Sequence, residues 1–445
     1  MSNLKADQAQ MRRHWSVLCN DIGYRFAGTA NEQKAADYIE GQFRRFGLEN
    51  IHQHRFDMPD WTFTKCTVRA GKGSTLKPIK TARPLLFSRS TPKQGVRGPL
   101  VYLQTGLPLD FKQPTRGKIG LLIGSLALAD PKMKQRVMDS GLKALLVVDS
   151  RIPVRWMTSS GAAPQWVDGY TMPSVSISYF DAVDLVKRMP QNVEVQVQSR
   201  IFPGRSQNVV GEIIGSEKPN EVIVVSGHHD AVWGNVGADD NGTGVVFTLE
   251  MARMFARRPR KPRRTMRFIS YGVEERLSVG SYLYMRSLSP REIKRCVFAF
   301  NCDGGASTVG EDEVRITGNA PLFKLATDHW NKAGHSAKVF NNVTPYSDHF
   351  PMNLAGVPSI YVGRPSMGNG GYWTLHSVYD NLDNVSPAVA AKTINTSAAL
   401  LAKVADSPRL PFPPRIDSAV MKEIQAMAKV QYRHPWSADQ FDYNA

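Results

Sequence analysis

The feature that most constrains the fold is a regular alternation of strand and helix patterns that begins near residue 204. The run "EVIVVSGHHD" (221–230) is apolar at successive positions, which is typical of a strand covered on both faces. The helical pattern "GVVFTLEMARMFA" (244–256) follows, and further strands and helices alternate to about residue 405. This order predicts an α/β fold, a three-layer sandwich in which a mainly parallel mixed sheet is flanked by helices.

Residues 68–203 have a different character. They open with a stretch rich in Gly, Pro, Ser and Thr and continue with strand, helix and strand patterns at 119–123, 131–140 and 144–148. We therefore expect a main domain formed by 1–67 and 204–405, a small inserted α/β domain at 68–203, and a Pro-rich tail at 406–445 with one helical piece.

The chain carries a formal net charge of +17, and its densest basic run is "RRPRKPRRTMR" (257–267). The run lies between a helix pattern and a strand pattern, so we expect a solvated loop. No motif with interleaved aromatic residues accompanies it, and we expect no nucleic-acid partner. No stretch approaches eighteen apolar residues, and we expect no membrane partner. The first residues lack the apolar core of a signal peptide, which favours a cytoplasmic protein unless a leader was removed from an exported one.

Ligand-type side chains gather where the predicted strands end. One strand runs into His228 and Asp230, and a Gly-rich loop then carries Asp240 into the next helix. The other candidates lie after the following strands, at Glu274, Glu275, Asp303 and His376. Because functional groups in open α/β sheets collect at the carboxyl ends of strands, these side chains are expected to share one edge of the sheet.

Imidazole and carboxylate ligands suit zinc, and a bridging carboxylate allows two ions to polarise a carbonyl for hydrolysis. A lone strand-end His or Asp is more often a cap or loop residue, and a Gly-rich loop alone could cradle phosphate. The loop here lacks GxGxxG and a GK[ST] ending, however, and five ligand-type residues lie at four successive strand-end positions. The pattern therefore favours a hydrolytic metal site.

The order of these motifs resembles that of the co-catalytic dizinc exopeptidases, a family that includes bacterial leucyl aminopeptidases and glutamate carboxypeptidase. The matching features are H-x-D at 228–230, G-A-D-D-N-G-x-G at 237–244, the E-E pair, the strand-end Asp and the distal His. The resemblance covers about 1–67 and 204–405, including the opening helices at 26–49. Residues 68–203 look like a protease-associated domain, an insert found in many exopeptidases of this kind.

The resemblance implies a role for each residue. His228 and Asp303 would bind one zinc ion, Glu275 and His376 would bind the second, and Asp240 would bridge the two. Glu274 would be the general base, and Asp230 would orient the ring of His228. The peptide bond between Asp240 and Asn241 would be cis.

Other residues receive smaller roles. Tyr346, ahead of the distal His, is a candidate to hydrogen-bond the developing oxyanion, with a plain pocket wall as the alternative. His229 points to the opposite side of its strand and is not expected to bind metal. Asp239 is expected to stabilise the loop, and Asp380 to orient His376. Arg276 departs from the family pattern and could lower the pKa of the base or bind a substrate carboxylate.

The sequence thus predicts a zinc-dependent exopeptidase with two Zn²⁺ per chain, most simply an aminopeptidase acting on peptides through a hydroxide that bridges the ions. A carboxypeptidase acting on dipeptides or acidic C-termini is the main alternative. A non-catalytic relative on the same fold and an aminoacyl cyclase with a single zinc are further ones, against which the complete set of ligands argues. The oligomeric state, a dimer included, is left open.

Overall fold

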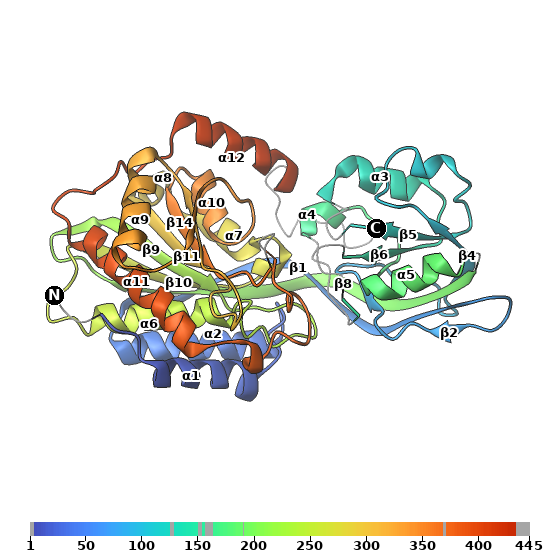
Figure 1. Ribbon diagram of the computed structural model, residues 1–445, viewed down its shortest axis with the longest axis horizontal. Helices are drawn as coiled ribbons and strands as arrows, with labels where there is room; N and C mark the ends of the chain where they lie inside the picture. Colours follow the sequence, from blue (N-terminus) through green and yellow to red (C-terminus); the bar gives the residue numbers. More distant parts are fainter. Residues whose placement is uncertain are drawn as a thin grey trace. The chain divides into compact units, whose positions relative to one another are not determined.

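The computed structural model describes residues 4–124, 129–149, 154–155, 163–189, 191–367 and 371–432 (Figure 1). The chain divides into two compact units. The larger unit contains residues 1–56, 206–372 and 379–429, and the smaller contains 57–205, 373–378 and 430–445.

A mixed sheet forms the centre of the larger unit. Its strands lie in the order β13 (Lys338–Asn341), β12 (Glu313–Thr317), β14 (Ser359–Gly363), β11 (Cys296–Cys302), β9 (Lys218–His228), β10 (Arg264–Tyr271) and the last part of β8 (Asn192–Ile213). The four strands β14, β11, β9 and β10 run parallel, whereas β12 and β8 pair antiparallel with their neighbours β14 and β10. The predicted mainly parallel mixed sheet is confirmed.

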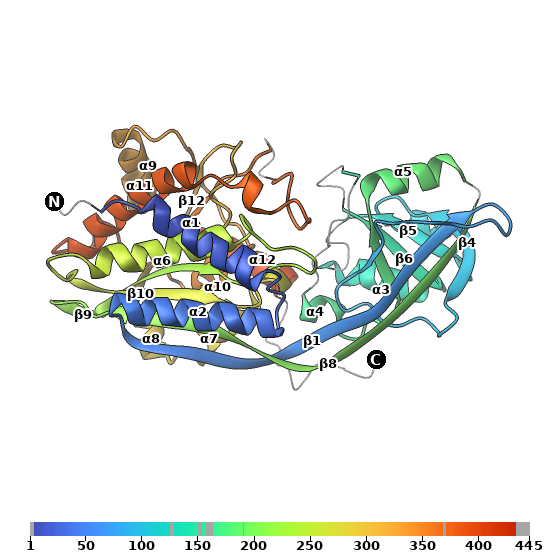
Figure 2. The ribbon, with the colours of Figure 1, turned by 90° about the horizontal axis from the view of Figure 1, so that it is seen from below.

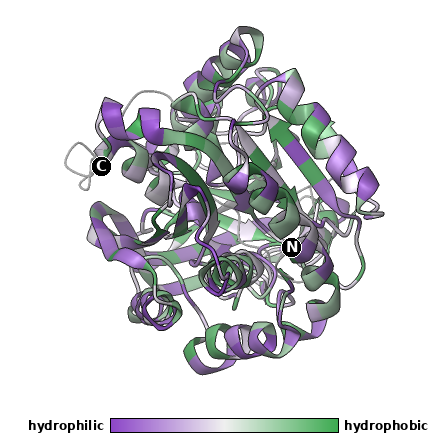
Figure 3. Cartoon of the chain, turned by 90° about the vertical axis from the view of Figure 1, so that its left-hand side faces the viewer, coloured by the Kyte–Doolittle hydropathy of each residue, from purple (hydrophilic) through white to green (hydrophobic). Residues whose placement is uncertain are grey.

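Helices cover both faces of this sheet. Along β9, Ile223 and Val225 face one apolar core, and Val222 and Val224 face the other. The first core is covered by α1 (Gln8–Ser16), α2 (Ala30–Phe46), α6 (Gly242–Ala256), α9 (Ala320–Lys332) and α11 (Pro387–Asp406). The second is covered by α7 (Val279–Ser287), α8 (Pro290–Arg295) and α10 (His349–Leu354) (Figure 2). Hydrophobic and hydrophilic stretches alternate along the helices in Figure 3, as expected for helices with one covered face.

The smaller unit has its own parallel sheet and its own apolar core. Strands β4 (Val96–Tyr102), β5 (Ile119–Ile123), β6 (Ala144–Val148) and β7 (Ser174–Ile177) are parallel neighbours, with β3 (Arg83–Pro84) at the edge beside β7. Three helices belong to this unit: α3 (Pro131–Asp139), α4 (Pro164–Val167) and α5 (Tyr179–Lys187). The predicted strand, helix and strand at 119–148 correspond to β5, α3 and β6.

Two long strands belong partly to each unit. Strand β1 (Glu49–Gly71), which also pairs with β2 (Lys77–Pro78), and strand β8 each continue from the larger unit into the smaller one. The predicted boundaries at 67/68 and 203/204 fall inside these strands, whereas the units divide at 56/57 and 205/206. The difference arises because a continuous strand carries no local composition signal where it leaves one core for another. The protease-associated character of the insert stays a prediction.

The C-terminal tail does not form a unit of its own. Residues 406–429, which include most of α12 (Ser418–Gln431), cluster with the larger unit. The predicted helical piece corresponds to α12, and residues 433–445 of the predicted tail lie outside the described residues. Among the described helices, none combines the length and the apolar character that a membrane span requires.

Residues 257–263 of the basic run form the expected loop between α6 and β10, whereas residues 264–267 belong to β10 and Arg264 is buried. Five of its seven Lys and Arg residues form ion pairs with acidic residues of the same unit: Arg258 with Asp406, Lys261 with Glu49, Arg263 with Glu217, Arg264 with Glu221, and Arg267 with Glu212. Most of the local positive charge is therefore balanced within the larger unit.

Strand β9 and helix α6 pack closely at two glycines. A Cβ atom on Gly227 would lie 2.7–2.8 Å from the backbone of Gly244, which is closer than nonbonded carbon atoms approach. The close packing places the last residue of β9 beside the first turn of α6, where the ligand-type residues lie.

We predict that Gly227→Ala lowers the free energy of unfolding by about 1–3 kcal/mol, because the added methyl group forces the helix away from the strand. Gly41→Ala in α2 is the matched control, since a Cβ there has no neighbour within 4 Å. The control should be neutral or stabilising by up to about 1 kcal/mol. Urea denaturation of both variants measures the difference, and equal stability of the two would contradict the close packing.

Candidate metal centre

The predicted ligand residues of the larger unit lie where parallel strands end. His228 is the last residue of β9, Asp303 follows the last residue of β11, and Glu274 and Glu275 lie in a 3-10 turn shortly after β10. Asp240 precedes the first turn of α6. Because β11, β9 and β10 are parallel neighbours, their carboxyl ends bring these side chains to one edge of the sheet.

Two sets of side chains are close enough to hold a metal ion. His228, Glu274 and Asp303 form one set, and His228, Asp240 and Glu275 form the other. Within each set, ligand atoms from the three residues lie within 4.8 Å of one another. Five of the six residues assigned to the metals or to the base are thus brought together.

The orientation of the His228 ring identifies the nitrogen that can bind a metal. Its Nδ1 atom lies 3.2 Å from the backbone oxygen of Asp230 and 3.4 Å from Oδ1 of the same residue. Both neighbours are acceptors, so Nδ1 carries the hydrogen and donates it. The lone pair of Nε2 then faces Oδ1 of Asp240 at 3.4 Å, Oδ1 of Asp303 at 3.4 Å and Oε2 of Glu274 at 3.7 Å.

This arrangement gathers several carboxylates around Nε2, which favours a proton or a metal ion at that nitrogen. Although burial alone would lower the pKa of His228, the carboxylates of Asp303, Asp230 and Asp240 raise it well above its usual value. Burial, together with Asp303 and other nearby acids, raises the pKa of Glu274 well above its usual value, which His228 partly opposes. Nε2 of His228 is buried and has no hydrogen-bond partner among the described residues. The site therefore needs positive charge beside Nε2, and a divalent cation meets that need.

Asp230 connects His228 to the pair of glutamates. Its Oδ1 atom accepts a hydrogen bond from the backbone N–H of Glu274 at 2.9 Å, and Oδ2 accepts one from Glu275 at 3.3 Å. Burial opposes ionisation, but contacts with His228 and the Glu274 N–H hold the pKa of Asp230 below its usual value. These contacts fit the predicted role of Asp230 in orienting the His228 ring. Asp230 also holds the turn that carries Glu274 and Glu275.

The loop before α6 is held by hydrogen bonds to its backbone. Asp380 accepts from the N–H of Asp239 through Oδ1 at 2.7 Å and from the N–H of Asp240 through Oδ2 at 3.0 Å. The side chain of Asn241 caps α6 through the N–H of Gly244 and donates to the carbonyl of Cys302. The Asp380 carboxylate thus binds the loop that presents Asp240, and its role in orienting His376 stays a prediction.

The predictions for Asp239 and the neighbouring peptide bond are confirmed. The Asp239 carboxylate accepts hydrogen bonds from Thr243, Ser307 and the backbone N–H of Ala306, which makes it a loop stabiliser. The peptide bond between Asp240 and Asn241 is cis.

Two buried residues near the N-terminus support the site and were missed in the sequence. The guanidinium of Arg25 is fully buried and donates to the carbonyls of His229, Val236 and Gly237, joining the end of β9 to the following loop. Glu32 accepts from the N–H of Gly28 and from the hydroxyl of Ser206. Arg25 belongs to no periodic pattern or spacing motif. Glu32 is the last residue of a Thr-x-x-Glu helix start, a pattern that indicates a cap but not a contact with Ser206.

Two tyrosine hydroxyls, also missed, hold the backbone at Asp303. Tyr361 donates to the Asp303 carbonyl at 3.0 Å. The Tyr372 hydroxyl lies 2.9 Å from the Gly304 carbonyl and accepts from the N–H of Arg364 at 3.1 Å. The chain therefore fixes Asp303 from the backbone side, which leaves the carboxylate directed at His228.

The remaining candidates lie outside the two sets. His376 lies in 373–378, the segment that clusters with the smaller unit, and neither set includes it. Tyr346 lies in the loop between β13 and α10 with 45% of its surface exposed. The metal role of His376 and the oxyanion role of Tyr346 stay predictions. His229 contacts the Ser270 hydroxyl through Nδ1, and burial lowers its pKa to about 4.

Arg276 does not have the exposure that binding a substrate carboxylate requires. Only 1% of its surface is exposed, and its guanidinium donates to the Ala27 carbonyl and lies over the ring of Phe26 at 4.9 Å. The proposal that Arg276 binds substrate is therefore wrong, because the side chain turns into the core.

Comparisons with known proteins agree with this geometry. Residues 208–401 match the model of Peptidase family M28. Aminopeptidase YwaD of Bacillus subtilis is 28% identical over 387 residues, covering 83% of this chain and 79% of its own length. Carboxypeptidase Q of Rattus norvegicus is 25% identical over 415 residues, covering 87% and 83%. The structure of a zinc aminopeptidase from Bacillus subtilis superposes with a TM-score of 0.76 at 23% identity, covering 93% of this chain and 99% of that one, and shows the same fold.

We predict that Glu32→Gln flattens the dependence of stability on pH. Burial and the nearby Asp230 carboxylate raise the pKa of Glu32 from 4.5 to about 8. The folded state therefore holds a proton that the unfolded chain has lost. This contribution to stability is fully present below pH 4.5 and is lost as the pH rises to about 8. Because the group exchanges one proton at most, the free energy of unfolding changes by no more than about 1.4 kcal/mol per pH unit in this range. Urea denaturation between pH 4.5 and 8.5 tests this, and parallel profiles of both proteins would refute it.

Proposed function

The larger unit of this chain belongs to peptidase family M28, and we propose that the protein is a zinc aminopeptidase with two metal ions, which removes residues from the N-terminus of peptides. The observation that carries the proposal is the set of carboxylates around the lone pair of His228. Such a site combines ligands for a hydrolytic metal with a carboxylate that can act as a base.

The donor set fits two divalent ions. Asp240, Glu274, Glu275 and Asp303 supply four negative charges when ionised, and His228 supplies a neutral nitrogen. Two ions of charge +2 balance these four charges. When bound, zinc would polarise the peptide carbonyl and lower the pKa of water. His228 and Asp303 would hold one ion and Glu275 the other, with Asp240 between them and His376 as a proposed further ligand.

Glu274 would move the proton. Its side chain is 13% exposed, and its Oε1 atom accepts a hydrogen bond from Ser278 at 3.1 Å. As a carboxylate, Glu274 can take up a proton from the attacking water. Glu274 would then deliver this proton to the leaving amine. The N–H contact to Asp230 keeps the turn in place while the charge on Glu274 changes.

The arginines beside the site favour an aminopeptidase. Arg25 donates to backbone carbonyls, Arg276 donates to Ala27, and Arg364 binds Asp312 and the Ser307 carbonyl. Each of these three guanidinium groups is thus turned to a partner within the larger unit. A carboxypeptidase needs a cation for the C-terminal carboxylate of its substrate, and these three guanidinium groups already bind partners within the unit.

A carboxypeptidase is the second candidate, and one finding favours it. Carboxypeptidase Q of the rat covers 87% of this chain at 25% identity, only slightly less similar than the aminopeptidase. The two candidates share the metal site and the base, so they differ only in which end of the substrate is bound.

We predict that Glu274→Gln keeps its zinc and loses turnover by about 10²–10⁴-fold, because the amide can no longer accept a proton. Glu275→Gln is the matched variant, one residue away, and should lose both zinc and activity because it removes a ligand charge. Elemental analysis and the hydrolysis of an aminoacyl anilide give the two readouts. Full activity of Glu274→Gln, or full zinc in Glu275→Gln, would contradict the assigned roles.

We also predict that the protein hydrolyses leucyl anilide and leaves an N-acetylated dipeptide intact. An aminopeptidase needs the free N-terminal amine of its substrate, and acetylation blocks that amine. The reverse preference would establish the carboxypeptidase, and cleavage of neither substrate by zinc-loaded protein would argue against exopeptidase function.

A further inference from the structure

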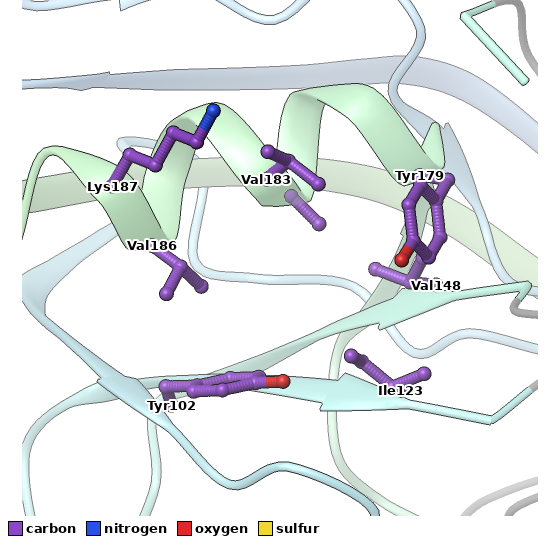
Figure 4. A pocket seen from close by; sticks show the side chains of 8 residues that line it. Tyr102, Ile123, Val148, Tyr179, Val183, Val186 and Lys187 are labelled. Atoms are coloured by element: carbon purple, nitrogen blue, oxygen red, sulfur yellow. The ribbon is translucent and has the colours of Figure 1, made fainter. Parts of the chain in front are cut away.

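The smaller unit contains a pocket of about 190 Å³ at the carboxyl ends of its parallel strands (Figure 4). Tyr102, Ile123 and Val148 line it from the ends of β4, β5 and β6. The opposite wall is α5, which contributes Tyr179, Ala182, Val183, Val186 and Lys187. Ligands in open α/β sheets bind at this edge, and a cavity of about 150 Å³ already holds a benzene ring.

The polar groups of the pocket lie at its ends. Tyr179 is the first residue of α5 and Lys187 the last, and the rise of a helix places them about 12 Å apart. Between them the walls are apolar. Neither the Tyr102 hydroxyl nor the Tyr179 hydroxyl has a hydrogen-bond partner within the described part of the chain, and Lys187 forms no ion pair there.

The charges around α5 leave Lys187 available. Asp184 pairs with Arg188 at 3.4 Å, and the carboxylate of Asp181 accepts from the hydroxyls of Thr81 and Ser178. Burial raises the pKa of Tyr102, with further contributions from Tyr179 and Asp110, so its hydroxyl remains a hydrogen-bond donor. The pocket therefore offers an apolar slot, two phenolic hydroxyls and one ammonium group.

We propose that this pocket binds the apolar C-terminal end of a peptide. The terminal carboxylate pairs with Lys187, a branched or aromatic side chain fills the slot beside Val183, and the preceding residue reaches toward Tyr179. Two or three extended residues span about 7–10 Å, which is within the distance of about 12 Å between Tyr179 and Lys187. The site is separate from the candidate metal centre and does not depend on the proposed function.

The test uses the full chain with the Glu274→Gln change, so that no probe is consumed. N-acetyl-leucyl-leucine is titrated by calorimetry against its C-terminal amide and against free leucine. We expect the acid to bind at least about threefold more tightly than either, since only the acid has both the carboxylate and the second residue. Equal binding of acid and amide, or no binding at about 10 mM, would overturn the proposal.

Paired variants locate the binding. Lys187→Glu should weaken binding of the acid by at least about fivefold, because it places a like charge beside the carboxylate. Arg188→Glu makes the same charge change at the next residue, which does not line the pocket, and should stay within about twofold of the parent. Val183→Trp, which fills the slot, should abolish binding. An equal effect of Lys187→Glu and Arg188→Glu would overturn the proposed site. Both residues are exposed, so we expect both variants to fold.

Discussion

The candidate metal centre depends on which nitrogen of His228 carries the hydrogen. Two oxygens of Asp230 face Nδ1, so the ring donates there and presents the lone pair of Nε2 to the carboxylates of Asp240, Asp303 and Glu274. Negative groups gathered around a lone pair repel one another. Positive charge between them removes this conflict, and a bound divalent cation would supply it.

The scaffold opposes the same repulsion through the backbone. Asp380 binds the N–H groups of Asp239 and Asp240, Asp230 binds those of Glu274 and Glu275, and Tyr361 binds the carbonyl of Asp303. These bonds leave the ligand side chains free to face the centre. The carboxylates of Asp380 and Asp230 thus accept hydrogen bonds from peptide groups, while neighbouring carboxylates face His228 as candidate metal ligands.

The fold and most of the site could be predicted from the sequence because both correspond to patterns among neighbouring residues. Continuous apolar runs identify β9 and β11, and ligand-type residues at their ends identify His228 and Asp303. Contacts between segments that are far apart in the chain correspond to no such local pattern. Arg25 joins residues more than 200 positions away, and nothing near it in the sequence indicates a buried cation. Arg276 was misread for the same reason, since its position beside the E-E pair does not reveal that its side chain enters the core.

The contacts of Arg25 have a consequence for biosynthesis. The residue leaves the ribosome long before the carbonyl of His229, which follows it by 204 positions, and the acceptors of the nearby loop appear later still. Until then the guanidinium of Arg25, which is buried in the folded protein, lacks the carbonyl groups that accept its hydrogen bonds. The helices at the start of the chain can form early, but they can dock only after most of the polypeptide has been translated.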